Sequence, residues 1–340
     1  MNIQDALAIL VEGNNLDQAQ TEDVFKLIMS GEATPAQIGA FLCAIRVKGE
    51  TPQEIAGAAS VMRALSTKVE VAHPNLVDTC GTGGSGTKLF NISTAAAFVT
   101  AASGAKVAKH GNRKMTSFSG SADVLEAAGV NLALSPEQIA TCVLEVGVGF
   151  MFAPAHHSAM RFAGPVRQEL GVRTLMNVLG PMTNPAGAKR QVIGVFSEEW
   201  QRKMAEVLKL LGAEHALIVH SDGLDEIRLS APTRVVELKN GTIDEYEISP
   251  SDFNISSHDE TSLRADSTEA SLSLLKSAIS APDRPEADIV AMNAGAAIYA
   301  SGVATNLKNG IEMAQDAISA GLAKERLDEF VRISKLMGEM

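Results

Sequence analysis

A cluster of glycines, Gly81-Thr-Gly-Gly-Ser-Gly86, lies between a short apolar run and an alanine-rich stretch. Glycine permits positive φ and lets the backbone approach a ligand closely. A helix predicted from about Asn91 would point its free N–H groups, and the positive end of its dipole, at an anion. The segment from Asp78 to Thr94 is therefore predicted to bind phosphate where a strand gives way to a helix.

The same glycines, at positions 81, 83 and 86, also match the G-x-G-x-x-G pattern of dinucleotide-binding folds. That function needs an acidic residue about 20 residues further on, to hold ribose hydroxyls. Here the next predicted strand, Ala105-Lys-Val-Ala-Lys109, runs into the basic segment His110-Gly-Asn-Arg-Lys114. A P-loop is excluded because no Gly-Lys-Ser/Thr closes the glycine run. One glycine-rich loop and one basic loop, each after a predicted strand, together predict a ligand with phosphates at separated positions.

The amino-acid composition restricts the kinds of partner and the compartment that we expect for this protein. The 340 residues include 29 Lys plus Arg and 40 Asp plus Glu, a formal charge of −11, so we expect neither nucleic acid nor a membrane as partner. The three cysteines show no CxxC spacing, which suits a reduced compartment, and Cys80 is expected to be structural. Because neither a leader nor an apolar run of about 18 residues is found, we expect a cytoplasmic protein.

The chain divides into two parts by its patterns. Residues 1–70 have helical spacing of apolar residues, and capping boxes begin at Thr34 and Thr51, with a third at Ser135. From about residue 75, β-prone runs alternate with helical segments, which is typical of a parallel α/β sheet. We expect a small all-helical N-terminal domain, 1–70, joined to a larger α/β domain, 71–340, with a mainly parallel central sheet. The segment Leu179-Gly-Pro-Met-Thr-Asn-Pro185 is turn-forming and is expected to be a hinge or crossing between the two parts. A segment around 165–185 is expected to join the helical part in space.

An acidic turn, Ser221-Asp-Gly-Leu-Asp-Glu226, follows another predicted strand. Mg²⁺ prefers oxygen ligands and often binds through one or two carboxylates plus substrate phosphates, so Asp225 and Glu226 are candidate ligands. Ser93 could also face the metal, while Asn91 and Thr94 donate to phosphate. The alternatives are a solvated acidic turn and simple capping of the helix.

Other polar residues give weaker signals. His156 and His157 are adjacent, which favours a packing or pocket-wall role over joint metal binding. One of Arg161, Arg167 and Arg173 is expected to hold an anionic substrate through its two-point fork. Since no catalytic triad or acid–base pair emerges, displacement of pyrophosphate at a sugar carbon, driven by positioning and charge neutralisation, fits these residues.

In combination, the motifs resemble those of the anthranilate phosphoribosyltransferases of tryptophan biosynthesis over essentially the whole chain. The matching segments are Gly81-Thr-Gly-Gly84, Asn91-Ile-Ser-Thr94, Lys109-His-Gly-Asn-Arg113, Ser119-Gly-Ser-Ala-Asp-Val-Leu-Glu126, Val166-Arg-Gln-Glu-Leu-Gly171, Asn177-Val-Leu-Gly-Pro-Met-Thr-Asn-Pro185 and Asp222-Gly-Leu-Asp-Glu226.

The resemblance implies transfer of phosphoribose from 5-phosphoribosyl-1-pyrophosphate (PRPP) to the amine of anthranilate, with inversion at the sugar C1 and release of pyrophosphate. It implies no catalytic side chain, two Mg²⁺ ions per chain held by Ser93, Asp225 and Glu226, and a homodimer formed through the helical part. The implied anthranilate-binding residues are Gly81, His110, Asn112 and Arg167. The implied PRPP-binding residues are Gly81, Gly84, Ser85, Leu89, Asn91, Ile92, Ser93, Thr94, Lys109, His110, Gly111, Asn112, Arg113, Ser117 and Ser121.

Three departures from the family pattern stand out. Ser85 replaces an acid of the glycine loop, Leu89 stands where a small hydroxyl residue is common, and Lys114-Met-Thr116 is unusual. We predict retained activity with altered PRPP affinity, which kinetics of Ser85→Asp would test. Two rivals are a pyrimidine nucleoside phosphorylase-like pentosyl transfer, which needs no metal site, and a non-enzymatic nucleic-acid-binding relative, which the negative charge disfavours.

Overall fold

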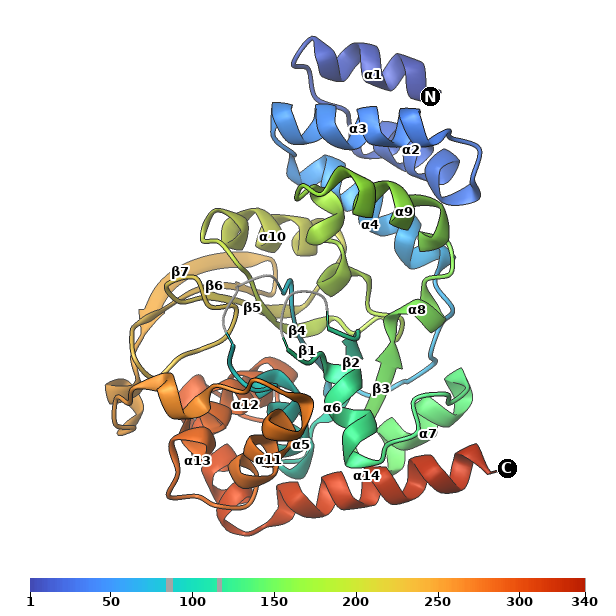
Figure 1. The fold of residues 1–340 in the computed structure, drawn as a ribbon. Helices are drawn as coiled ribbons and strands as arrows, with labels where there is room; N and C mark the ends of the chain where they lie inside the picture. Colours follow the sequence, from blue (N-terminus) through green and yellow to red (C-terminus); the bar gives the residue numbers. More distant parts are fainter. Residues whose placement is uncertain (84–87, 115–117, 340) are drawn as a thin grey trace.

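The computed structural model describes residues 1–83, 88–114 and 118–339. Its N-terminal part consists of helices stacked at one end of the molecule (Figure 1), namely α1 Ile3–Val11, α2 Gln18–Ser30, α3 Pro35–Lys48 and α4 Pro52–Leu65. The capping boxes predicted at Thr34 and Thr51 are confirmed, and Asp17 forms another at the start of α2. These caps satisfy N–H groups that the first helical turn leaves without partners.

A seven-stranded sheet forms the centre of the larger part, in the order β3-β2-β1-β4-β5-β6-β7. Its strands are β1 Leu76–Gly81, β2 Lys106–Gly111, β3 Val148–Phe152, β4 Arg190–Gly194, β5 His215–His220, β6 Thr233–Lys239 and β7 Thr242–Ile248. All pairings from β3 to β5 are parallel, and those of β6 and β7 are antiparallel. The predicted fold class, a helical domain joined to a larger α/β domain with a mainly parallel sheet, is confirmed.

Helices cover both faces of this sheet (Figure 1). The helices that follow residue 70 are α5 Ile92–Ala102, α6 Ser121–Ala128, α7 Pro136–Glu145, α8 Ala153–His156, α9 Met160–Leu170, α10 Glu199–Leu210, α11 Thr268–Ala278, α12 Pro285–Ser301, α13 Leu307–Ser319 and α14 Leu322–Gly338. Along β5, Leu217 and Val219 join the core formed with α5 and α12, whereas Ala216 and Ile218 join the core on the other face. This alternation is the period of two that a strand buried on both faces requires.

The N-terminal helices share a hydrophobic core with one face of the sheet. That core contains side chains of α2, α3 and α4 together with Trp200 and Met204 of α10 and Ile218 of β5. Helix α9, from the middle of the chain, packs on α2 and α3, and the Phe162 ring lies so close to Gly31 that a Cβ there would come within 2.6 Å of it. Chain segments far apart in sequence thus build one apolar layer above the sheet.

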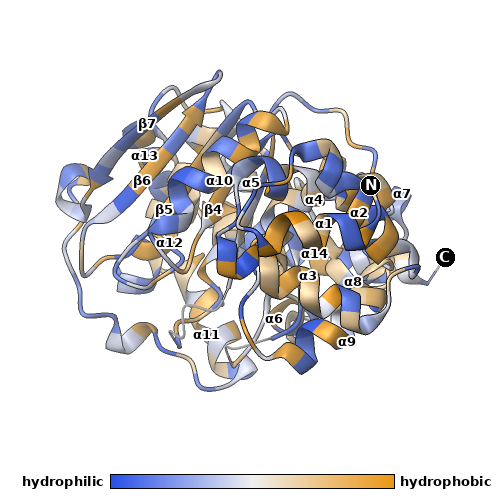
Figure 2. Cartoon of the chain, turned by 90° about the horizontal axis from the view of Figure 1, so that it is seen from above, coloured by the Kyte–Doolittle hydropathy of each residue, from blue (hydrophilic) through white to orange (hydrophobic). Residues whose placement is uncertain are grey.

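Seen from above, the helical part carries hydrophobic and hydrophilic residues side by side (Figure 2). Apolar side chains of α3, including Phe41 and Ile45, are fully buried, while Val47 on the same helix is exposed. Within residues 1–83, 88–114 and 118–339, no helix combines the length and the apolar character needed to cross a membrane.

Candidate functional site

The carboxyl ends of β1 and β4 lie next to each other at the point where the strand order changes direction. Gly81 of β1 pairs with Gly194 of β4. The helices that follow these strands, α5 and α10, belong to the cores on opposite faces of the sheet. Ligands of open α/β sheets bind in the crevice at such a switch point. A polar cavity of about 290 Å³ lies there, lined by the ends of β1, β2 and α5 and by the acidic turn.

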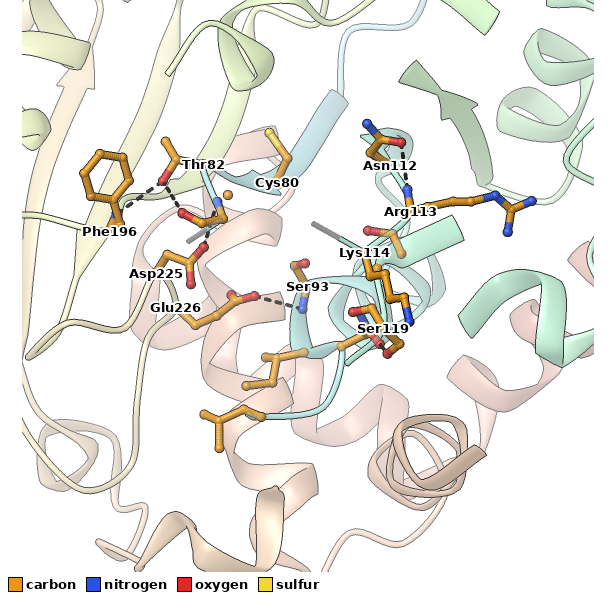
Figure 3. Close-up of a pocket in the computed structure, with 18 of the residues that line it drawn as sticks. Cys80, Thr82, Ser93, Asn112, Arg113, Lys114, Ser119, Phe196, Asp225 and Glu226 are labelled. Atoms are coloured by element: carbon orange, nitrogen blue, oxygen red, sulfur yellow. Dashed lines mark hydrogen bonds between the residues drawn. The ribbon is translucent and has the colours of Figure 1, made fainter. Parts of the chain in front are cut away.

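The glycine segment begins at Gly81 and reaches Gly83, whose φ of 67° favours glycine. The backbone N–H of Gly83 donates to Oδ2 of Asp225 at 3.1 Å (Figure 3). The predicted site residues Gly84 and Ser85 lie outside the described residues, as do Ser117 and the Met115-Thr116 pair of the second loop. The described end of the glycine segment is therefore attached directly to the acidic turn.

The three predicted metal ligands lie together. The N–H of Ser93, in the first turn of α5, donates to Oε1 of Glu226 at 3.2 Å, and Asp225 lies beside Glu226 (Figure 3). Burial, reinforced by the charge of Asp225, raises the pKa of Glu226. The described residues contain no closed group of three or more His, Cys, Asp and Glu side chains. Two carboxylates and one hydroxyl form an open set of hard oxygen donors, which fits Mg²⁺ completed by water and substrate phosphate.

Lys109 is buried at the end of β2 and lines the polar cavity. Its Nζ donates to the backbone oxygen of Thr79 and to Oγ of Ser93, at 3.2 Å in the second case. Burial lowers the pKa of this ammonium group, while the carboxylate of Asp78 opposes the shift. Lys109 therefore holds the Ser93 hydroxyl in place in addition to contributing positive charge.

The residue before the first turn of α5, Asn91, does not cap this helix with its side chain. The Oδ1 atom of Asn91 accepts from Ser119 and Ser271, both at 2.7 Å. Asn91, Ile92 and Ser93 line the polar cavity together with Leu89, whereas Thr94 is buried away from it. The predicted tetrad is thus divided between the cavity wall and the core.

The basic loop contributes a second wall. Gly111, Asn112, Arg113 and Ser121, which were predicted to bind PRPP, all line the polar cavity. The guanidinium of Arg113, however, pairs with Glu126 at 2.7 Å and Asp123 at 3.2 Å on α6, and it points away from Asp225 and Glu226 (Figure 3). In this structure Arg113 holds the loop to α6.

A second, more apolar cavity of about 520 Å³ adjoins the first. The four predicted anthranilate-binding residues line both cavities: Gly81, His110, Asn112 and Arg167. Burial, followed by the neighbouring His157, lowers the pKa of His110 to about 3, so its imidazole is neutral. The two rings meet edge to face with centroids 5.1 Å apart. The pocket-wall role expected for His157 is thus observed, since it lines this second cavity.

The three candidate arginines for binding an anionic substrate lie at different places in the site. Arg167 of α9 is half-buried at the junction of the cavities, and burial lowers the pKa of its guanidinium. Exposed Arg161 lines only the apolar cavity, and Arg173 lines only the polar one, stacked 4.0 Å from the centroid of the Phe196 ring. Among the three, Arg167 alone reaches both cavities.

Sequence reasoning missed three contributors. Asp78, buried in β1, accepts a hydrogen bond from the backbone N–H of His110 at 3.1 Å and so fixes the start of the basic loop. Asn177 lines both cavities, although the sequence indicated it only as the first residue of a family-like motif, with no binding role. Gly194 makes room for the Asp225 backbone. Two of these residues carried a signal in the sequence: Asp78 is an acid inside an apolar strand, and Gly194 is a glycine at the end of a strand. Cys80 was expected to be buried and structural, but it is half-buried and lines both cavities. Burial raises the pKa of its thiol, which disfavours a role as nucleophile.

Comparison with known proteins adds independent observations. Two family models match: the glycosyl transferase family a/b domain over residues 73–324 and the glycosyl transferase family helical bundle domain over residues 4–66. The chain is 56% identical to an anthranilate phosphoribosyltransferase of Teredinibacter turnerae, covering 99% of this chain and 100% of that protein.

Solved structures agree with this similarity. An anthranilate phosphoribosyltransferase from Thermus thermophilus superposes with a TM-score of 0.92 at 41% identity, covering 97% of this chain and 99% of that one. The enzyme from Saccharomyces cerevisiae, solved in complex with PRPP and Mg, has a TM-score of 0.88 at 26% identity, with 98% of each chain covered.

Proposed function

Because the chain belongs to the anthranilate phosphoribosyltransferase family of glycosyltransferases, we propose that it transfers phosphoribose from PRPP to the amine of anthranilate. The products are N-(5-phosphoribosyl)anthranilate and pyrophosphate, with inversion at the sugar C1, as a step of tryptophan biosynthesis. The observation that carries this proposal is the pair of adjoining cavities, one polar and one apolar, with a common wall at Gly81, His110, Asn112 and Arg167.

The two cavities suit the two substrates. The polar cavity combines the glycine segment, the start of α5 and the basic loop, groups that bind phosphate oxygens. The apolar cavity can hold an aromatic ring, and the Arg167 fork at its inner end suits a carboxylate. In this arrangement the amine faces the sugar carbon at the junction. Neutral His110 adds no charge there, and the acceleration comes from positioning and electrostatics without a catalytic side chain.

Ser93, Asp225 and Glu226 are the proposed ligands of Mg²⁺, with two ions per chain. The raised pKa of Glu226 supports this assignment, because a buried carboxylate beside another carboxylate is stabilised by a nearby cation. Bound Mg²⁺ neutralises charge on the pyrophosphate leaving group. The chain supplies the orientation, since Gly83 holds Asp225 while the Ser93 backbone holds Glu226.

We further propose that the enzyme is cytoplasmic, forms a homodimer through its helical part and binds neither nucleic acid nor membranes. The formal charge of −11 supports the exclusion of nucleic acid. The division into domains at about residue 70, with the segment around 165–185 beside the helical part, is part of the same proposal. The packing of α9 on α2 and α3 supports it.

The first experiment mixes purified protein with PRPP, Mg²⁺ and anthranilate and follows the loss of anthranilate fluorescence. Metal-free and Ser85→Asp samples run alongside. Loss that depends on Mg²⁺ supports the proposed reaction, and we expect Ser85→Asp to change the KM for PRPP. If fluorescence is lost only with Ser85→Asp and not with the parent, the parent protein no longer has this activity. Metal-independent phosphorolysis of a pyrimidine nucleoside would favour the phosphorylase-like alternative.

A further inference from the structure

Arg228 lies two residues beyond Glu226 and forms a forked ion pair with Glu260. Its Nη2 is 2.7 Å from Oε2, and its Nε is 3.1 Å from Oε1. The two side chains are only 16% and 8% exposed. Oε1 of Glu260 also accepts from the backbone N–H of Leu229 at 3.1 Å. The pair is therefore held in a fixed orientation, unlike an ordinary surface ion pair.

The remaining nitrogen of Arg228 reaches the acidic turn. Nη1 donates to the backbone oxygens of Ser221 and Asp222, at 3.4 and 3.3 Å. Asp222 and Gly223 both have positive φ, 43° and 80°, and the turn is closed by mutual backbone hydrogen bonds between Ser221 and Leu224. Asp225 and Glu226 follow directly. One guanidinium thus supports the carbonyls of the turn that presents both proposed metal ligands.

Glu260 connects the same ion pair to another part of the wall of the polar cavity. It begins the 3₁₀ helix Glu260–Leu263, whose last residue accepts from the N–H of Phe90 at 3.0 Å. The N–H of Ala265 donates to the backbone oxygen of Lys88 at 2.8 Å. Leu89 and Phe90 line the polar cavity immediately before α5. The ion pair, the 3₁₀ helix and these backbone hydrogen bonds therefore join the acidic turn to the Lys88–Phe90 segment of the cavity wall.

We propose that Arg228, through Glu260, is a positioning residue that sets the acidic turn at the correct distance from the Lys88–Phe90 wall, so that the metal and the phosphoribosyl group of PRPP are bound together. This inference rests on the proposed function of the polar cavity. Arginine is required because its planar fork serves the carboxylate and the turn at once, whereas a lysine ammonium is a single point charge.

The test compares Arg228→Lys and Glu260→Gln, singly and together, with the parent. We expect Arg228→Lys to raise the KM for PRPP about 10-fold while kcat at saturation stays within about 2-fold, since the fork is lost but the charge remains. The KM for anthranilate should not change. Calorimetric titration of PRPP with Mg²⁺ should show the same loss of affinity. The double variant should be no worse than the single ones, because they break one interaction.

Arg332→Lys and Glu329→Gln are matched controls. Arg332 makes the same two-point contact with Glu329, at 2.6 and 2.8 Å, but on the exposed surface of α14. These variants should keep the parental KM for PRPP. If Arg228→Lys does not fold, Glu260→Gln and its PRPP affinity decide the question.

Lower melting temperatures with parental KM and parental PRPP affinity would overturn the positioning role. A parent that binds no PRPP would overturn the proposed function itself, and this inference with it.

Discussion

The backbone carbonyl of Asp225 lies against Gly194, so closely that a Cβ on this glycine would overlap the carbonyl oxygen. On the neighbouring strand, a Cβ on Gly81 would come within 2.8 Å of Oδ2 of the same aspartate. Gly81 and Gly194 are paired in the sheet. Two facing glycines therefore make the space that one acidic residue occupies at the centre of the site.

Gly194→Ala should lower kcat/KM about 100-fold, because the added methyl group displaces the Asp225 backbone and a shift of about 1 Å can cost this much. Steady-state kinetics with PRPP and anthranilate measure the effect. The matched control is Gly164→Ala in α9, where nothing lies within 4 Å of the added Cβ. Parental kcat/KM in Gly194→Ala would show that the turn tolerates displacement.

Arg167→Lys should raise the KM for anthranilate about 10-fold, because lysine cannot make the two-point contact that arginine offers a carboxylate. The KM for PRPP in the same variant provides the internal control and should change much less. Equal changes in both KM values would contradict the assignment of Arg167 to the acceptor.

Acid should destabilise the protein through His157. Burial of its imidazole, followed by the charge of His156, lowers its pKa from 6.5 to about 4. The unfolded chain therefore takes up a proton between these values and the folded chain does not. Stability is complete above pH 6.5 and falls below it, by up to about 1.4 kcal/mol per pH unit.

Urea unfolding of the parent and of His157→Phe measures this effect. Between about pH 7 and about pH 5, the parent should lose about 2 kcal/mol more unfolding free energy than the variant. Identical losses would mean that His157 titrates normally in the folded protein.

A different pH dependence is expected at Glu237, on which both tyrosines of the chain converge. Burial alone would raise the pKa of Glu237, but hydrogen bonds from His215, Tyr246 and Tyr299, each 2.8 Å long, lower it to about 2. The stabilisation is present above the ordinary value of 4.5 and is lost as the pH falls toward 2.

Glu237→Gln should therefore lower the unfolding free energy by about 3 kcal/mol at neutral pH. The difference from the parent should shrink below about pH 4.5. Denaturant unfolding at several pH values tests both parts, and a constant difference across them would rule out the ionised form of Glu237 as the source.

Local signals predicted much of the fold. The caps at Thr34, Thr51 and Ser135 begin helices as expected, because a capping box is a property of four consecutive residues. The antiparallel strands β6 and β7 were missed, although the Asn240-Gly241 pair between them, with φ of 50° and 80°, is a typical hairpin signal. Parallel strands β1 and β2 were found by their alternation with helices.

The sequence indicated candidate site residues but not their contacts. It predicted that Asn91 and Asp225 lie in loops near strand ends, where a ligand is expected to bind. It could not indicate that Asn91 accepts from Ser271, 180 residues away, or that Gly194 makes room for Asp225. Such contacts depend on strand register and on helix placement, which no local pattern contains.

The apolar layer shared by the N-terminal helices and the sheet limits how the chain can be recombined with its relatives. A chimera that takes only residues 1–66 from another family member would set foreign helices against Trp200 and Met204 of α10 and against Phe162 of α9. Exchange should succeed when α9 and α10 move together with the N-terminal helices, because close-packed side chains on both sides of such a boundary must fit each other. The unit that can be exchanged between relatives is therefore defined by packing and is discontinuous in sequence.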